Sequence, residues 1–303
     1  MIVDLPNTTT NDVNKKITAL REEGGAITLG RVLTLVIAPD TEDLVESSIE
    51  SATSASREHP CRIIVVVPGD RLATEPRLDG QIRVGSDAGA GEVVVLRISG
   101  PLSVHAHSVV LPFLLPDTPV VAWWPGASPT VPADDPLGRL ALRRITDATA
   151  SEDPLAAIKG RLDGYTDGDT DLAWSRITYW RALLASAVDQ PPYEPITSAV
   201  VSGLKDEPAL DILAGWLACR IDGPVQRVVG ELKVELHRPS ETVVLSRPQD
   251  GVTATLSRTS RPTALVPLQR RETRDCLAED MRRLDPDEIY HEALAGIAQV
   301  QYV

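Results

Sequence analysis

The strongest constraint on the fold is a pair of continuous apolar runs separated by one amphipathic segment. Residues 31–39 read RVLTLVIAP and residues 62–67 read RIIVVV, whereas residues 41–56 read TEDLVESSIESATSAS. Unbroken β-branched runs are typical of strands buried on both faces, and the segment between them has apolar residues at helical spacing. A strand, a helix and a second strand in this order predict a parallel sheet that is covered by helices.

The rest of the first half extends this pattern. We expect a short charged helix at residues 12–23 and further strands at residues 92–98 and 118–124. Between these two strands we expect an interrupted helix at residues 102–115, and after them a final helix and strand at residues 137–149. Pro112 is expected to bend or interrupt the helix of residues 102–115. The string DGYTDGDTD from Asp163 is rich in turn formers, which indicates a boundary. The sequence therefore predicts an α/β N-terminal domain with a mostly parallel sheet over residues 1–165.

The second half has a different pattern, with helices and closely spaced strands. Residues 171–189 predict one long helix, with Asp169, Thr170 and Asp171 as its N-cap and first-turn residues. After it we expect a strand at residues 196–201 and a helix at residues 208–219. Three strands at residues 225–236, 241–245 and 252–256 follow, and one or two helices from residue 269 onward. This order predicts an α+β C-terminal domain with antiparallel strands over residues 166–303.

Charge and cysteine content restrict the class of partner. The chain has 30 Lys and Arg residues against 43 Asp and Glu residues, a net charge of −13, which argues against binding of nucleic acid or of anionic membranes. We expect no secretory signal, and prolines interrupt the most apolar stretch, residues 109–124. Cys61, Cys219 and Cys276 are odd in number and far apart. This pattern suits a reducing compartment and predicts a cytoplasmic protein.

Motifs for catalysis, cofactors and metals do not have the spacing that their chemistry requires. The first strand is followed by APDTEDL, without the glycines of a dinucleotide-binding turn, and no P-loop, zinc-protease or nucleophile-elbow motif occurs. The glycine-rich string that starts at Gly85 precedes a strand and is interpreted as a loop. His105 and His107 lack a third ligand, and the Asp163–Asp171 string lacks the spacing of a calcium loop. We expect no catalytic residues, cofactor or metal.

The string REHPCR places His59 and Cys61 two residues apart, between Arg57 and Arg62. Two interpretations are open: a thiol nucleophile activated by its cationic neighbours, or a buried cysteine at the start of a strand after a helix with cations at its C-terminal end. The second is favoured, because ligand crevices of open α/β sheets form at the carboxyl ends of the strands and this loop lies at the opposite end.

Tryptophan and arginine recur in two further motifs. Trp123 and Trp124 adjoin Pro-Gly at the end of a predicted strand, and either pack in the core or anchor an interface. On the long helix, Arg176 and Trp180 are four residues apart, and Arg181 lies on the adjoining face. That helix is either locked between the domains or offered to a partner.

The REHPCR, WWPG and DLAWSRITYWRALLA strings resemble the glucose-6-phosphate dehydrogenase assembly protein family, also called OpcA, over residues 30 to 300. The resemblance implies a non-enzymatic factor that binds glucose-6-phosphate dehydrogenase, favours its active oligomeric state and supports the oxidative pentose phosphate pathway and NADPH supply. Photosynthetic members have paired cysteines near the C-terminus that are associated with redox control. Cys276 is the only cysteine after residue 219, so such a switch is not expected.

Residues in these strings are the candidates for the partner interface: Arg57, His59, Arg62, Trp123, Trp124, Arg176, Trp180 and Arg181. The alternative function is a phosphosugar- or nucleotide-binding enzyme or sensor on the parallel sheet. In that case Arg57 and Arg62 would be phosphate ligands.

Overall fold

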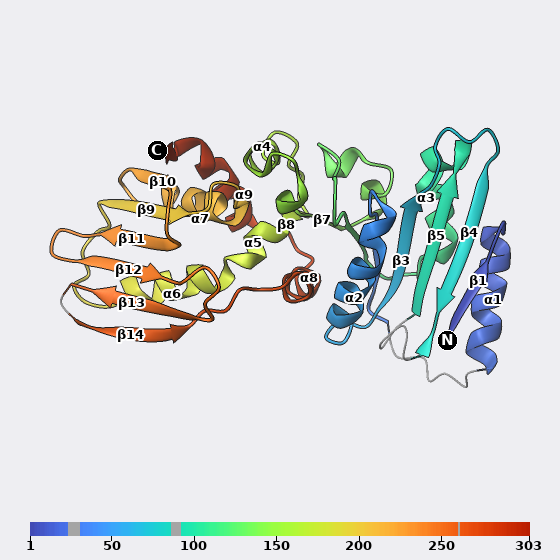
Figure 1. Ribbon diagram of the computed structural model, residues 1–303, viewed down its shortest axis with the longest axis horizontal. Coiled ribbons are helices and arrows are strands. Elements are labelled where there is room, and N and C mark those ends of the chain that lie inside the picture. The colour runs from blue at the N-terminus through green and yellow to red at the C-terminus, as the bar shows by residue number, and fades with distance from the viewer. Residues whose placement is uncertain (24–30, 86–91, 260) are drawn as a thin grey trace. The chain divides into compact units, whose positions relative to one another are not determined.

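A computed structural model describes residues 1–23, 31–85, 92–259 and 261–303. The glycine-rich string from Gly85 to Gly91 therefore lies almost wholly outside the described residues. The chain forms two compact units, each containing one sheet (Figure 1). The first unit comprises residues 1–147, 166–170 and 273–285, and the second comprises residues 148–165, 171–272 and 286–303.

The sheet of the first unit has the strand order β1-β4-β5-β3-β2-β6-β7-β8. Its strands are β1 (Ile2–Leu5), β2 (Leu33–Ile37), β3 (Cys61–Pro68), β4 (Arg77–Arg83), β5 (Glu92–Ser99), β6 (Val120–Trp123), β7 (Arg143–Thr146) and β8 (Asp169–Asp171). Strands β5, β3, β2, β6 and β7 run parallel to one another, which confirms the mostly parallel sheet. Strands β4 and β1 add an antiparallel edge that was not predicted, because their alternating pattern is short and polar.

Helices cover both faces of this sheet. They are α1 (Thr10–Glu23), α2 (Val45–Ala55), α3 (Ala106–Val110) and α8 (Thr273–Arg282). Helix α1 buries Val13, Ile17 and Leu20 in the same apolar cluster as residues of α3, and α2 packs against α8. Pro112 interrupts the helix of residues 102–115, as expected, since α3 is flanked by 3-10 turns at Gly100–His105 and Leu111–Phe113.

The sheet of the second unit has the order β14-β13-β12-β11-β9-β10-β15. Its strands are β9 (Ser198–Gly203), β10 (Val225–Val229), β11 (Lys233–His237), β12 (Thr242–Ser246), β13 (Thr253–Arg258), β14 (Arg261–Pro267) and β15 (Gln301–Tyr302). Strands β14 to β9 in this order are antiparallel, as expected, whereas β9, β10 and β15 are parallel. The single strand expected at residues 225–236 is wrong: a turn divides it into β10 and β11.

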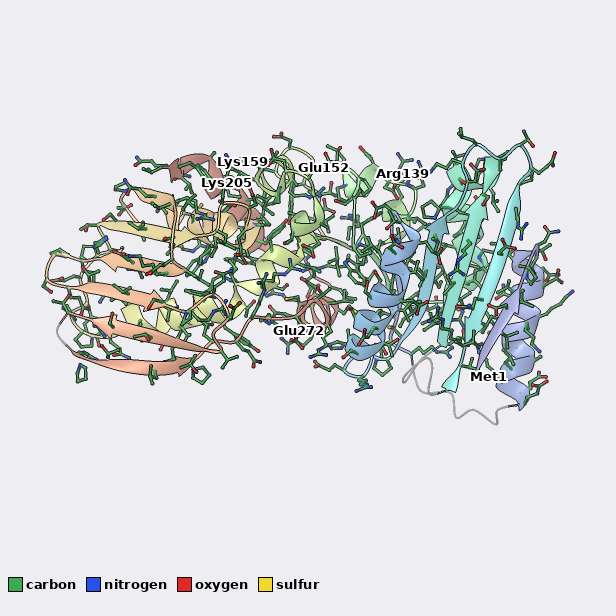
Figure 2. All side chains as sticks on the ribbon, in the orientation of Figure 1. Met1, Arg139, Glu152, Lys159, Lys205 and Glu272 are labelled. Atoms are coloured by element: carbon green, nitrogen blue, oxygen red, sulfur yellow. The ribbon has the colours of Figure 1, made fainter. Side chains whose placement is uncertain are left out.

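Helices of the second unit are α4 (Pro154–Gly160), α5 (Leu172–Arg176), α6 (Thr178–Val188), α7 (Pro208–Ala218) and α9 (Glu288–Gly296). Helix α7 packs against α9, and most of its residues are buried. Lys159 belongs to α4 (Figure 2). Its ammonium group lies 4.3 Å from the ring centre of Tyr302.

The long helix expected at residues 171–189 is wrong in one respect, because it breaks at Ile177 between α5 and α6. Ile177 has φ −97° and ψ 5°, outside the helical range. Asp171 is the N-cap, and its carboxylate accepts a 3.0 Å hydrogen bond from the N–H of Ala173. Asp169 and Thr170 do not cap the helix as expected; they belong to strand β8, where the Asp169 carboxylate pairs with Arg144.

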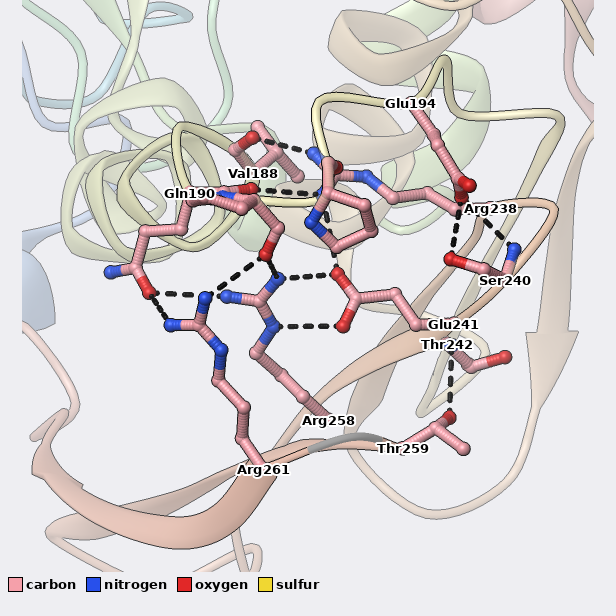
Figure 3. A network of polar contacts seen from close by, with 12 residues as sticks. Val188, Gln190, Glu194, Arg238, Ser240, Glu241, Thr242, Arg258, Thr259 and Arg261 are labelled. Carbon is pink, nitrogen blue, oxygen red and sulfur yellow. Dashed lines mark hydrogen bonds and ion pairs between the residues drawn. The ribbon is translucent and has the colours of Figure 1, made fainter.

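A buried polar network ties the chain after α6 to strands β12 and β13 (Figure 3). Glu241 is 4% exposed and its carboxylate accepts from Arg238, at 3.2 Å, and from Arg258. Arg258 and Arg261 also donate to the side chain of Gln190 and to the carbonyl of residue 191. One buried carboxylate therefore orders two strands and a loop.

Candidate functional site

The REHPCR string is largely a structural element of the first unit. Arg57 is exposed and His59 half-buried, just after α2. Arg62 is 6% exposed; its Nε lies 3.1 Å from Oε1 of Glu92, and its Nη1 donates a 2.6 Å hydrogen bond to the carbonyl of Phe113. Burial lowers the pKa of Arg62 to about 10, although Glu92 opposes this shift. The Arg62 guanidinium is thus engaged within the unit.

Cys61 is fully buried at the start of β3. Burial raises the pKa of its thiol to about 12, and the charge of Arg31 only partly opposes the shift. A thiol that stays protonated at neutral pH and has no access to solvent is a poor nucleophile. The interpretation as a buried strand cysteine is therefore confirmed.

The two adjacent tryptophans point to opposite faces of the parallel sheet, as expected from strand geometry. Trp124 packs in the apolar cluster that includes Val110 and Phe113, whereas Trp123 is outside that cluster. Trp123 is 2% exposed and Trp124 is 4% exposed. Both indoles are core side chains of this unit, and their part in an interface stays a prediction.

The Trp/Arg motif of the second unit lies beside a group of arginines that the sequence did not bring together. Arg176 and Trp180 line a cavity of about 30 Å³ whose other polar lining residues are Glu207, Arg247, Gln269, Arg270 and Arg271. We call this site the arginine pocket. The Arg247 guanidinium lies 5.8 Å from the ring centre of Trp180, and that of Arg271 lies 4.9 Å from the ring centre of Tyr179.

The arginine pocket has four guanidinium groups and one carboxylate among its lining residues. Arg270 Nη2 lies 3.9 Å from Glu207 Oε1, whereas Arg247 is 8% exposed and its Nε has no hydrogen-bond partner among the described residues. Burial lowers the pKa of Arg247, although the charge of Glu207 opposes the shift, so this guanidinium carries a desolvation cost. Its Nη1 donates a 2.8 Å hydrogen bond to the carbonyl of Leu268. A carboxylate or phosphate group would relieve that cost by charge-assisted hydrogen bonds.

Arg181 is placed differently from its neighbours on α6. It is half-buried, and its guanidinium carbon lies 3.4 Å from the ring centre of Trp174. The same indole donates a 2.9 Å hydrogen bond from its Nε1 to Asp287. Arg181 therefore covers a core tryptophan, and it is not among the residues that line the arginine pocket.

Sequence reasoning found Arg176 and Trp180 but missed Arg247, Arg270 and Arg271. Arg247 follows β12, and the other two follow β14, a strand that was not predicted. The adjacent pair at 270–271 is the one sequence signal that could have drawn attention to this end of the sheet.

Among the residues that the structure describes, no group of three or more His, Cys, Asp or Glu side chains is placed to hold a metal ion. Nor does any helix within those residues combine the length and apolarity needed to cross a membrane.

Comparison with known proteins identifies the family. Residues 52–162 match the model of the glucose-6-phosphate dehydrogenase subunit N-terminal domain, and residues 167–294 match that of the corresponding C-terminal domain. The chain belongs to the OpcA family of glucose-6-phosphate dehydrogenase assembly proteins. The two models meet near residue 165, where the sequence predicts its boundary, and their names describe an assembly subunit rather than an enzyme.

A relative from Synechococcus elongatus, the "Putative OxPP cycle protein OpcA", is 28% identical over 179 residues. The match covers 54% of this chain but only 40% of that relative. A solved structure is described as "Trehalose-6-phosphate from E. coli bound with UDP-2-fluoro glucose". The match covers 65% of this chain and 64% of that chain, and the sequence identity is 8%. Its TM-score of 0.27 is too low to support any argument.

Proposed function

We propose that this chain binds glucose-6-phosphate dehydrogenase and favours its active, oligomeric state without catalysing a reaction of its own. The observation that carries the proposal is the match of both halves of the chain to the two domain models of the dehydrogenase assembly family. In this role the protein acts in the cytoplasm and supports the oxidative pentose phosphate pathway and its NADPH supply.

The physical basis of such activation is differential affinity. A partner that binds the competent state of an enzyme more tightly than the incompetent state shifts the equilibrium by that difference and by nothing more. A tenfold gain in active dehydrogenase requires about 1.4 kcal/mol of preference. By linkage, substrate or NADP that favours the active state will also tighten binding of this protein.

Among the predicted interface residues, those that line the arginine pocket are the most suitable contacts for the dehydrogenase. The cavity of this pocket is far smaller than a metabolite site, which has about 300–1,000 Å³, so it can admit only the head group of an acidic side chain. Arg and Trp also carry much of the binding energy in protein interfaces. We therefore expect a carboxylate of the dehydrogenase to contact Arg247, Arg270 and their neighbours.

The test is co-purification of the dehydrogenase with charge-reversal variants. Arg176→Glu combined with Arg270→Glu should weaken binding by about 100-fold or more, because two attractive contacts become repulsive. Size-exclusion chromatography, with dehydrogenase activity measured across the peak, reports both assembly and activation.

Lys15→Glu is the matched control for each of the two single variants, since it also reverses one cation, on the exposed side of α1. Its binding should equal that of the parent. Normal binding by the double variant would exclude the arginine pocket as the contact. Failure of the parent protein itself to bind or activate the enzyme would reject the function.

The alternative, an enzyme or sensor of phosphosugars or nucleotides, is favoured by one observation, a cavity at the carboxyl edge of the parallel sheet. Turnover of any such metabolite by the purified chain alone would support the enzyme. Binding without turnover is compatible with an assembly factor that also has a small-molecule site.

A further inference from the structure

The first unit has a cavity of about 430 Å³ at the carboxyl ends of its parallel strands. Residues that follow β2, β3, β5 and β6 line it, among them Asp40, Arg71, Ser103 and Trp124. We call it the carboxyl-edge cavity. Its volume lies in the range of sites for small molecules, and it is more than ten times that of the arginine pocket.

The position of the carboxyl-edge cavity follows from the strand order. From β2 the chain continues to β3 on one side, whereas β6, reached later from β5, lies on the other side of β2. Chain connections therefore diverge at β2. In open α/β sheets ligands bind in the crevice that such a divergence leaves at the carboxyl ends.

The apolar part of the lining suits the face of a ring. Val66, Ile98 and Leu137 come from the buried core, and the indole of Trp124 is part of the same lining. Proline rings at positions 39, 68, 129 and 136 supply rigid apolar walls. Rigid walls bind a ring without losing side-chain entropy.

The polar part comprises two carboxylates, a guanidinium and a hydroxyl, on Asp40, Asp135, Arg71 and Ser103. Asp135 accepts a 2.8 Å hydrogen bond from the N–H of Leu137, which orients its carboxylate. Carboxylates accept hydrogen bonds from hydroxyl groups, and a guanidinium binds phosphate.

Gly126 ends the Trp-Trp-Pro-Gly motif and makes room for Asp40. A Cβ atom at position 126 would lie 1.9 Å from Oδ1 of Asp40, so no other residue fits there without displacing the carboxylate. The motif therefore has a structural role at this cavity, through Trp124 in the wall and Gly126 beside the acid.

The turn after β2 restricts how many phosphates the ligand can carry. Residues 38–44 contain no glycine, so the backbone cannot form the cradle that binds pyrophosphate. Asp43 at the first turn of the following 3-10 segment would repel a polyphosphate, whereas the charge of Glu42 is paired with Arg97. A single phosphate at Arg71 is compatible with these charges.

We propose that the carboxyl-edge cavity binds a hydroxylated ring compound with one phosphate, a sugar monophosphate either free or as part of a nucleoside monophosphate. Its ring packs on the Trp124 and proline walls, its hydroxyls donate to Asp40 and Asp135, and its phosphate pairs with Arg71. Only the consequence, that this ligand modulates the assembly of the dehydrogenase, rests on the function proposed above.

Calorimetric titration of the full chain, without the dehydrogenase, tests the site. Glucose 6-phosphate and adenosine monophosphate are the two probes, which separate the free sugar phosphate from the nucleotide, and glucose and inorganic phosphate are the partial ligands. We expect saturable binding of one probe, tighter than that of either partial ligand.

Asp40→Asn and Arg71→Ala should each weaken this binding by about tenfold or more, since each removes a charge-assisted hydrogen bond. Both side chains are exposed, so the fold should tolerate these changes. Asp117→Asn, at an exposed position before β6, and Arg77→Ala, on β4, are matched controls outside the lining and should bind like the parent.

Three results would overturn the proposal: no binding of either probe at millimolar concentration, equal affinity in the two cavity variants and the parent, or inorganic phosphate binding as tightly as the probes. A chain that binds the probe but not the dehydrogenase would reject the proposed function and leave this site intact. A chain that binds the dehydrogenase but neither probe would reject this site and leave the proposed function intact.

Discussion

At the scale of single residues, burial decides which reactive groups are chemically available. The sequence shows Cys61 beside cations, as in an activated thiol, yet the strand places its sulfur in the core and raises its pKa. Likewise Arg62 pairs with Glu92, which also pairs with Arg21 and Arg31. The exposure of a side chain, unlike its residue type, depends on long-range packing, so it could not be predicted from the REHPCR string.

The cysteines should differ in their reaction with a thiol reagent. Cys61 and Cys276 are fully buried, whereas Cys219 is partly accessible, although burial also raises its pKa. We expect Ellman's reagent at pH 8 to label only Cys219 in the native protein, slowly, and all three thiols after denaturation. Prompt labelling of Cys61 in native protein, identified by mass spectrometry, would contradict its burial.

Asp211 on α7 should make stability depend on pH. Burial raises its pKa from 3.8 to about 6 although Arg227 opposes the shift. The folded state thus holds a proton that the unfolded state has lost, so the stability from this group is full below pH 4 and declines as pH rises to 6. Asp211→Asn removes this decline, which amounts to about 1–3 kcal/mol.

Urea unfolding of parent and Asp211→Asn proteins at pH 4.5 and 7.5 measures the effect. The free energy of unfolding of the parent minus that of the variant should be lower at pH 7.5 than at pH 4.5. Asp222→Asn, on an exposed turn after α7, should leave the difference unchanged. A parent-minus-variant difference that rises with pH would show that Arg227 outweighs burial.

At the scale of elements, periodicity predicted the buried strands well and the edges poorly. Strands β2 and β3 carry unbroken apolar runs because both faces are covered, and α1 has the expected stripe. Strand β14 was missed because most of its residues are exposed, so selection for apolar side chains is weak. The break between α5 and α6 was missed because Ile177 has nothing in its local sequence that ends a helix.

The Glu241 network at the edge of the second sheet should be essential for local stability. Glu241→Gln leaves Arg238 and Arg258 buried beside a neutral group, and breaking a buried ion pair costs about 3–5 kcal/mol. Hydrogen exchange should show faster opening of β12 and β13, and the urea midpoint of this unit should fall.

Glu235→Gln is the control, since Glu235 on β11 pairs with the more exposed Lys233 at 2.7 Å. An exposed pair contributes about 0–1 kcal/mol, so this variant should behave almost like the parent. Equal effects of the two substitutions would show that burial of Glu241 adds nothing to its pairing.

At the scale of the whole molecule, each unit is assembled from segments that are far apart in sequence. Residues 273–285 belong to the first unit, although residues on both sides of them belong to the second. The two proposed sites are on different units, with the carboxyl-edge cavity in the first and the arginine pocket in the second. Their variants can therefore separate ligand binding from dehydrogenase binding.

The sequence alone determined the class of each sheet and the family, because buried strands, helix stripes and the Trp/Arg strings are local patterns that the chain order preserves. The tertiary structure decided which of those residues are available. It buried Arg62, Trp123 and Cys61, and it brought Arg247 and Arg270 beside Trp180, and Asp40 beside Gly126. Such juxtapositions depend on how strands are ordered in space, and spacing along the chain carries no record of that order.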